Sequence, residues 1–152
     1  MILGLHHAAI AVASIDDALA FYCDLLGFEV VMNADLPAGI DAMAQALGID
    51  DSEFKVRMIK KGNSCIELFE FGQSQPGDHL RPPNKLGITH IALVSDQIDE
   101  DYQQLASNGV TFNAPLFGGA PGRFAYGRDP FGNVIELLEH NPEAADALNF
   151  TS

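Results

Sequence analysis

Apolar and polar residues follow one another along the chain in an order that occurs twice. Continuous or alternating apolar residues predict buried strands at 5–13 and 88–94. After each strand, apolar residues recur at helical intervals, and the predicted helices end at Gly27 and at Asn108-Gly109. Each copy then continues with three more predicted strands, at 28–32, 54–60 and 64–71 in the first copy and at 110–113, 123–128 and 134–139 in the second. The repeated unit is therefore βαβββ.

Local signals mark the ends of these elements. Ser14 and Asp17 have the spacing of a capping box and predict the start of the first helix. Asp-Pro-Phe-Gly at 129–132 predicts a type I turn between the last two strands. The segment between the copies is rich in glycine, proline and polar residues, which indicates a linker. We therefore expect a single domain over 1–152, made of a first module at 5–71 with an insertion at 34–51, a linker at 72–87, a second module at 88–140 and a C-terminal tail at 141–152.

One histidine and one glutamate recur at matching positions of the two copies. HAAIAV, which begins at His7, matches HIALVS, which begins at His90. The closing strands, GNSCIELFE and GNVIELLE, carry Glu67 and Glu136. Successive residues of a strand point to opposite faces, so the histidine and the glutamate of each copy share the face away from the helix. The match between the copies also selects His7 over its neighbour His6.

Carboxylates at these positions need a partner. A buried carboxylate must be hydrogen-bonded, protonated or bound to a cation, because its desolvation is otherwise too costly. One interpretation is that each histidine hydrogen-bonds the neighbouring glutamate inside a core. The other is that the copies face each other and bring together two imidazoles and two carboxylates, a set that binds a divalent transition metal and leaves positions open. The recurrence of the pair favours the metal site.

Composition and charge restrict the possible partners. The chain has 152 residues, 47% of them hydrophobic, which is enough for the core of one globular domain. A formal net charge of −13 opposes binding to nucleic acid or to an acidic membrane surface, so we expect a small-molecule substrate. The N-terminal segment has neither the basic region of a signal peptide nor the length of a membrane span, and we expect a cytoplasmic protein. Cys23 and Cys65 form no metal or redox motif and are expected to be reduced.

The two modules, their HAAIAV and HIALVS openings and the closing segments GNSCIELFE and RDPFGNVIELLE resemble the vicinal oxygen chelate superfamily. That superfamily includes glyoxalase I, methylmalonyl-CoA epimerase, extradiol dioxygenases and drug-resistance proteins. The resemblance implies an α+β fold in which two tandem βαβββ modules form a cupped mixed sheet around a metal site. It also implies one divalent ion, Zn, Ni, Co, Mn or Fe, and ligands at His7, Glu67, His90 and Glu136. It further implies a homodimer, since small two-module members commonly dimerise.

Occupation of all four ligand positions favours the branch of the superfamily that contains glyoxalase I and the epimerases. The resemblance then implies a lyase or isomerase, similar to lactoylglutathione lyase or an acyl-CoA epimerase, that removes a proton beside a carbonyl and stabilises an enediolate with the metal. Glu136 is the first choice for the base and Glu67 the second. Two alternatives stay open: an iron(II) extradiol dioxygenase, which uses two histidines and one carboxylate, and a resistance-type protein that binds a small molecule without turnover.

Overall fold

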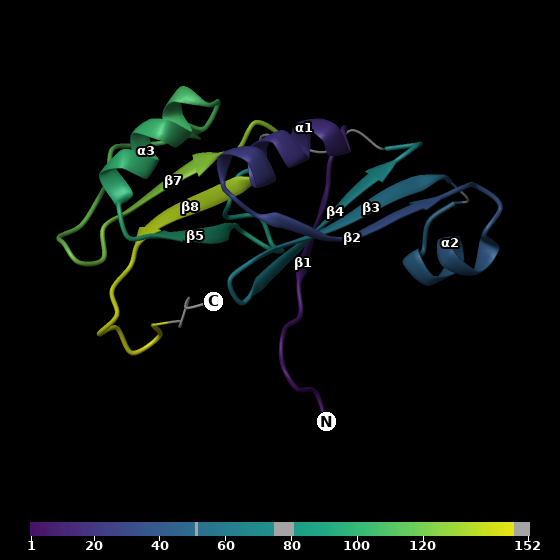
Figure 1. The fold of residues 1–152 in the computed structure, drawn as a ribbon, viewed down its shortest axis with the longest axis horizontal. Helices are drawn as coiled ribbons and strands as arrows, with labels where there is room; N and C mark the ends of the chain where they lie inside the picture. Colours follow the sequence, from purple (N-terminus) through teal and green to yellow (C-terminus); the bar gives the residue numbers. More distant parts are fainter. Residues whose placement is uncertain (51, 75–80, 148–152) are drawn as a thin grey trace. The chain divides into compact units, whose positions relative to one another are not determined.

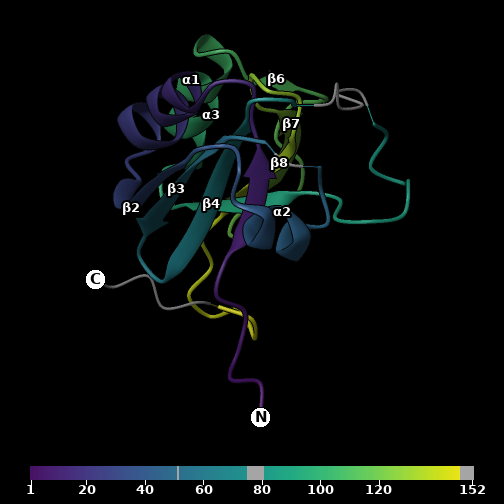
Figure 2. The same cartoon turned by 90° about the vertical axis from the view of Figure 1, so that its right-hand side faces the viewer.

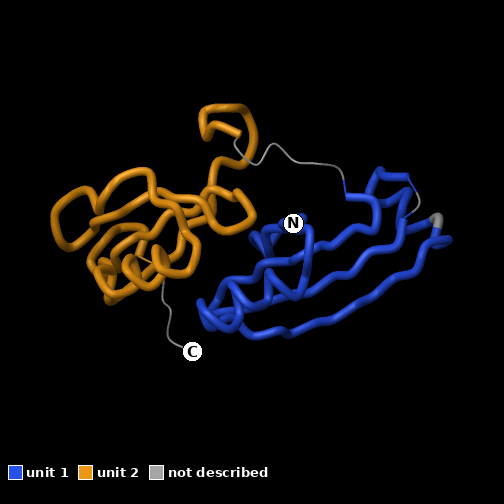
Figure 3. Tube along the Cα trace, turned by 90° about the horizontal axis from the view of Figure 1, so that it is seen from above, with its two compact units in different colours: residues 1–76, 149–152 blue, residues 77–148 orange. Residues whose placement is uncertain are grey.

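The structure is a computed structural model that describes residues 1–50, 52–74 and 81–147. Parts of the predicted insertion, linker and tail, at Asp51, 75–80 and 148–152, lie outside the described residues. The described residues divide into two compact units, one that ends at Ser74 and one that begins at Arg81 (Figure 3). Each unit is described below by itself. Among the described residues, no helix is both long and apolar enough to cross a membrane.

Unit 1 contains one four-stranded mixed sheet. Its strands lie in the order β1-β4-β3-β2, with β1 parallel to β4 and the other neighbours antiparallel. Its elements are β1 (Ala8–Ala11), α1 (Ile15–Leu19), the π-helical turn η1 (Ala20–Leu25), β2 (Glu29–Leu36), α2 (Asp41–Leu47), β3 (Phe54–Lys61) and β4 (Ser64–Phe71) (Figure 1). The helix α2 falls in the predicted insertion and ends at Gly48, whose φ of 69° is the left-handed conformation that glycine adopts most easily.

Unit 2 repeats this arrangement without α2. Its strands lie in the order β5-β8-β7-β6, and β5 is again parallel to the last strand of its unit. Its elements are β5 (Ile91–Ser95), α3 (Ile98–Ser107), β6 (Thr111–Phe112), β7 (Phe124–Arg128) and β8 (Val134–Glu139) (Figure 1 for β5 and Figure 2 for the others). The predicted α+β class and the repeated βαβββ unit are confirmed.

The core of each unit lies on the helix side of its sheet. Ile66 and Leu68 of β4 are buried, and so are Ile135 and Leu137 of β8, as strand alternation predicts. The glutamate between each pair of these residues points to the opposite face and is only partly buried. Burial thus distinguishes a packed face from a second face that carries polar side chains.

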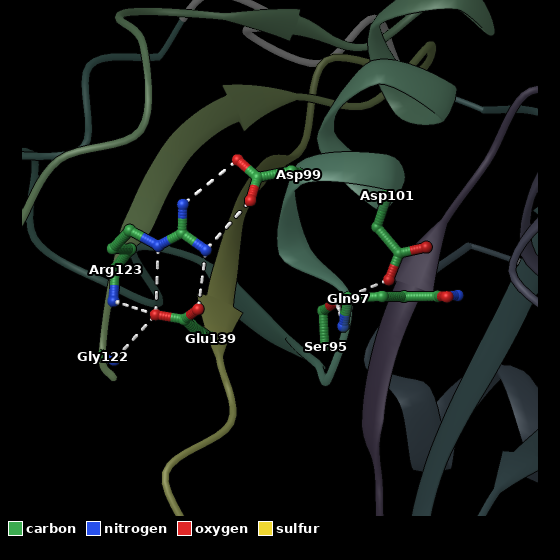
Figure 4. Close-up of polar contacts among 7 residues, drawn as sticks. All are labelled: Ser95, Gln97, Asp99, Asp101, Gly122, Arg123 and Glu139. Atoms are coloured by element: carbon green, nitrogen blue, oxygen red, sulfur yellow. Dashed lines mark hydrogen bonds and ion pairs between the residues drawn. The ribbon is translucent and has the colours of Figure 1, made fainter. Parts of the chain in front are cut away.

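The two helices begin with different hydrogen bonds. Ser14 caps α1 as predicted, since its Oγ accepts a hydrogen bond from the backbone N–H of Asp17 at 3.2 Å. At the start of α3 the serine lies further upstream: Ser95 Oγ accepts from the backbone N–H of Gln97 at 3.0 Å and donates to Asp101 at 2.5 Å (Figure 4). In both arrangements a serine hydroxyl accepts a hydrogen bond from a backbone N–H group close to the start of the helix.

Strand boundaries differ from the prediction where strand pairing decides them. The first strand was predicted at 5–13, but β1 begins at Ala8 and Leu5 is 91% exposed. Ala8 pairs with Ile66, and β4 begins only two residues earlier, so residues before His6 have no strand to pair with. Conversely, β2 continues through 34–36 because β3 supplies antiparallel partners there.

Candidate metal centre

The first predicted pair lies at the parallel edge between β1 and β4. His7 directly precedes β1, and the β1–β4 register sets Ala9 opposite Glu67. His7 Nε2 lies 3.3 Å from Glu67 Oε2, and the two side chains are 34% and 17% exposed. The other ring nitrogen, Nδ1, lies 2.8 Å from Nδ1 of His6. His7 therefore turns Nε2 toward the carboxylate, while His6 contacts the far side of its ring.

The second pair repeats this geometry in unit 2. His90 directly precedes β5, and Glu136 lies in the middle of β8 opposite Ala92. His90 Nε2 lies 3.1 Å from Glu136 Oε2, with exposed fractions of 30% and 14%. Nδ1 of His90 lies 2.8 Å from Thr89 Oγ1. A hydrogen bond at Nδ1 is the usual way to leave Nε2 available for a metal ion.

These separations fit two ligands of one metal ion. Bonds of about 2.1 Å set neighbouring ligand atoms about 3.0 Å apart in an octahedron and about 3.4 Å apart in a tetrahedron. The observed separations of 3.3 and 3.1 Å fall in that range. They are also compatible with a direct contact between imidazole and carboxylate, so each pair by itself fits both interpretations of the sequence.

The structure brings together two residues of the predicted set in each unit. Among the described residues, no group of three or more histidine, cysteine, aspartate or glutamate side chains could hold a metal ion. The combination of His7 and Glu67 with His90 and Glu136 into one site therefore stays a prediction.

A tyrosine in unit 2 has no equivalent in unit 1. Tyr126 on β7 lies opposite Glu136 in the antiparallel register, and its ring meets the His90 ring edge-on with centroids 5.2 Å apart. Partial burial, together with a side-chain hydrogen bond to Glu136, raises the pKa of Tyr126. The matching position opposite Glu67 is Met58. That Tyr126 lies opposite Glu136 depends on the β7–β8 register, which periodicity along one strand does not predict.

The second acid of each closing strand has a structural role. Glu139 accepts hydrogen bonds from the backbone N–H groups of Gly122 and Arg123 at 3.0 and 3.2 Å, and from Nη2 of Arg123 at 2.7 Å (Figure 4). The Arg123 guanidinium also binds Asp99 in the first turn of α3. The Arg123 side chain, followed by these backbone N–H groups, lowers the pKa of Glu139 to about 2.

Glu70 occupies the equivalent position in unit 1. It accepts a hydrogen bond from the backbone N–H of Ile15 at 2.7 Å and pairs with Nζ of Lys55, also at 2.7 Å. Both acids thus connect the end of the closing strand to the start of the helix. Their partners are already in place, which leaves Glu67 and Glu136 as the candidates for chemistry.

A surface hollow in unit 1 lies outside the predicted site. It has a volume of about 350 Å³ and contains neither His7 nor Glu67. Its lining includes Asp35, Lys55 and Glu70, and the last two pair with each other. The hollow supplies no further ligand for the His–Glu pair.

Comparisons with known proteins cover most of the chain. The Uncharacterized protein YaeR of Escherichia coli is 30% identical over 137 residues, which are 88% of this chain and 94% of that protein. A Probable lactoylglutathione lyase of Synechocystis is 29% identical over 136 residues, 88% of this chain and 92% of that protein. A 2-epi-5-epi-valiolone epimerase of Actinomyces is 25% identical over 147 residues, 90% of this chain and 79% of that protein.

Solved structures share the fold. A glyoxalase family protein from Bacillus cereus superposes with a TM-score of 0.81 at 24% identity, over 91% of this chain and 95% of that one. The fosfomycin resistance protein FosX from Listeria monocytogenes, complexed with Mn(II) and sulfate, gives a TM-score of 0.59 at 21% identity, over 94% and 97% of the two chains. Residues 4–137 match the family description Glyoxalase/Bleomycin resistance protein/Dioxygenase superfamily. The chain, with its two βαβββ modules, belongs to this superfamily.

Proposed function

We propose that the protein is a metal-dependent lyase or isomerase that removes a proton beside a carbonyl group of a small molecule. The observation that carries this proposal is the repeated His–Glu pair, with Nε2 to Oε2 separations of 3.3 and 3.1 Å in the two units. The names of two relatives, a probable lactoylglutathione lyase and an epimerase, support the same class of chemistry.

Under this proposal His7, Glu67, His90 and Glu136 together hold one divalent ion, whether within one chain or across a homodimer. The donor set fits, because imidazole and carboxylate are ligands that Zn, Ni, Co, Mn and Fe all accept. When bound, such an ion polarises adjacent substrate oxygens and stabilises the negative charge that develops as the carbon loses its proton.

The protein's own residues have distinct tasks in this proposal. The contacts of His6 and Thr89 at the Nδ1 atoms of His7 and His90 orient both rings. One carboxylate, Glu136 or Glu67, takes the proton from carbon and returns it. Partial burial of both glutamates keeps bulk water from competing for that position.

Metal analysis followed by a substrate panel tests the proposal. The purified protein, loaded in turn with Ni, Co, Zn, Mn and Fe(II), is assayed on a hemithioacetal, an acyl-CoA epimer and a catechol. Solvent deuterium should enter the substrate carbon during turnover, and replacement of the basic carboxylate by glutamine should slow the reaction at least about 100-fold. Tight binding of these compounds without turnover under any metal would instead favour a resistance-type binding protein.

The role of Glu67 separates the proposed class from a ring-cleaving dioxygenase. A lyase that uses four protein ligands should lose metal affinity and activity together in Glu67→Ala. A dioxygenase that uses only His7, His90 and Glu136 should keep much of both. Consumption of oxygen with a catechol, dependent on iron(II), would therefore replace the proposal with the dioxygenase alternative.

A further inference from the structure

Three aromatic side chains of unit 2 form a row that begins beside the proposed site. Tyr126 of β7 lies opposite Glu136 of β8, and Phe124 lies two residues away along β7, on the same face of the sheet. The Tyr126 ring meets the His90 ring edge-on with centroids 5.2 Å apart, and the Phe124 ring lies 5.7 Å from the Tyr126 ring. The Phe117 ring continues the row at 5.4 Å from the Phe124 ring. We call Phe117, Phe124 and Tyr126 the aromatic row.

The outer end of the aromatic row is both exposed and held in place. Phe117 is 69% exposed. Its backbone N–H donates a hydrogen bond to the carbonyl of Phe124 at 2.8 Å, and its carbonyl accepts one from the N–H of Phe124 at 2.9 Å. Two residues paired in this way have their side chains on one face of the sheet. The backbone therefore keeps the Phe117 ring beside the Phe124 ring, although most of its surface remains accessible.

The first module has buried side chains without rings at the matched positions. Met58 of β3 lies opposite Glu67, and Val56 lies two residues before it. These side chains are 8% and 5% exposed. Phe124 and Tyr126, at the matched positions of β7, are only partly buried. The second module thus leaves apolar surface accessible next to its glutamate, where the first module packs it away.

We propose that the aromatic row binds a planar apolar group of the substrate, which a linker of a few atoms joins to the two oxygens that chelate the metal. This inference rests on the proposed function, since an ion held by His90 and Glu136 fixes where the substrate begins. A molecule bound there lies over the face of the sheet that carries the row. Phe124 lies about 7 Å further along β7 than Tyr126, which sets the length of the linker.

The chemistry of the row selects the bound group. Aromatic rings stabilise an apolar group by removing its surface from water, and they add stacked or edge-on contacts when that group is itself a planar ring. Phe117 is then a specificity-determining residue, because its ring supplies the most accessible surface of the row.

Hydroxamates, whose two adjacent oxygens chelate divalent metals, serve as probes. The protein is loaded with Ni(II) or Zn(II), freed of excess metal and titrated by calorimetry with three of them: acetohydroxamate, phenylbutyrohydroxamate and cyclohexylbutyrohydroxamate. The wild type should bind the phenyl compound about 10- to 100-fold more tightly than acetohydroxamate, the effect of burying most of a phenyl ring. It should bind the phenyl compound about 2- to 10-fold more tightly than the cyclohexyl compound, because the row favours a planar ring.

Variants of the row test its role through the ratio of the phenylbutyrohydroxamate affinity to the acetohydroxamate affinity. Phe117→Ala should lower this ratio about 3- to 10-fold, and Phe124→Leu should lower it as well. Phe117→Trp, which keeps an aromatic ring, should stay within about twofold of the wild type. Val31→Ala, at a 54% exposed position of β2 outside the row, is the control and should leave the ratio unchanged. Loss of metal or loosening of the fold lowers both affinities together and does not change the ratio.

The outcomes separate this inference from the proposed function. If the loaded wild type binds acetohydroxamate and the phenyl compound equally well, the role of the aromatic row is wrong and the metal site stands. If Phe117→Ala is less stable than the wild type but keeps the full ratio, the row packs against another part of the protein, and the inference is again wrong. If the wild type binds no divalent metal, or binds no hydroxamate once loaded, both the inference and the proposed function are wrong.

Discussion

A double-mutant cycle between the two modules tests whether one metal ion joins them. The variants are His7→Ala, His90→Ala and the combination, which remove one imidazole from each His–Glu pair. If all four side chains hold one ion, either single variant should abolish most of the stabilisation that the metal provides. If each pair acts alone, the two losses should simply add.

The expected coupling follows from mass action. Metal at 100 times its dissociation constant stabilises the folded wild type by about 2.7 kcal/mol. We take the loss of one ligand to weaken metal binding by about 100-fold, the upper end of the effect of losing a residue that hydrogen-bonds a ligand. At the same metal concentration, a single variant then keeps about 0.4 kcal/mol of the stabilisation by the metal. Each single variant then loses about 2.3 kcal/mol and the double variant about 2.7 kcal/mol, so the coupling is about 2 kcal/mol.

Urea unfolding with metal and with EDTA provides the measurement. The coupling energy measured with metal, minus the coupling energy measured with EDTA, is the part of the coupling that depends on the metal. In thermal scans the wild type should gain about 5 to 11 °C with metal, since 1 kcal/mol corresponds to about 2–4 °C for a chain of this size. A cycle of His7 and Glu67, which are in contact within unit 1, is the positive control and should show coupling even in EDTA. Metal-dependent losses that add within about 0.5 kcal/mol would refute a shared ion.

Three further predictions concern the scaffold of the site. The pKa of Glu139 is lowered to about 2, below the value of about 4.3 for an unfolded chain. The contribution of Glu139 to stability is therefore present above about pH 4.3 and is lost as the pH falls toward about 2. Glu139→Gln should flatten the pH dependence of the free energy of unfolding, measured in urea, over that interval, and an unchanged slope would contradict the prediction. Ser14→Ala should lower the free energy of unfolding by about 1 kcal/mol through loss of the helix cap, with Ser14→Asp close to the wild type in the same assay. Leu68→Ala, at a fully buried position of β4 beside Glu67, should cost about 2–5 kcal/mol, and a cost below 1 kcal/mol in urea unfolding would show that the core is not packed there.

Short-range signals account for the parts of the fold that were predicted from the sequence. The cap at Ser14 and the turn at Asp129 depend on residues within four positions, and both hydrogen bonds occur: Asp17 N–H to Ser14, and Gly132 N–H to the carbonyl of Asp129 at 3.1 Å. Strand alternation likewise predicts the buried and the polar face of β4 and β8 without knowledge of their neighbours.

Pairing between strands accounts for what the sequence did not predict. β1 begins later than predicted because its pairing depends on where β4 begins. Tyr126 lies opposite Glu136 only because β7 and β8 pair in one particular register. A change of register by one residue would move Tyr126 to the other face of the sheet. Contacts of this kind join residues that are distant in sequence, so periodicity along one strand carries no information about them.

The distribution of positive charge explains why the recurrent glutamates divide into two kinds. Each closing strand carries two acids three positions apart, which alternation places on opposite faces of the sheet. The acids at 70 and 139 each meet a basic side chain, Lys55 or Arg123, and backbone N–H groups as well. In the described part of the chain, Glu67 and Glu136 form ion pairs with histidine and with neither lysine nor arginine. The chain has a net charge of −13, and these two partly buried carboxylates have an imidazole but no permanent cation beside them. A divalent ion would supply the missing charge there, and this is why we propose the metal site at these glutamates and not at the better-bonded acids.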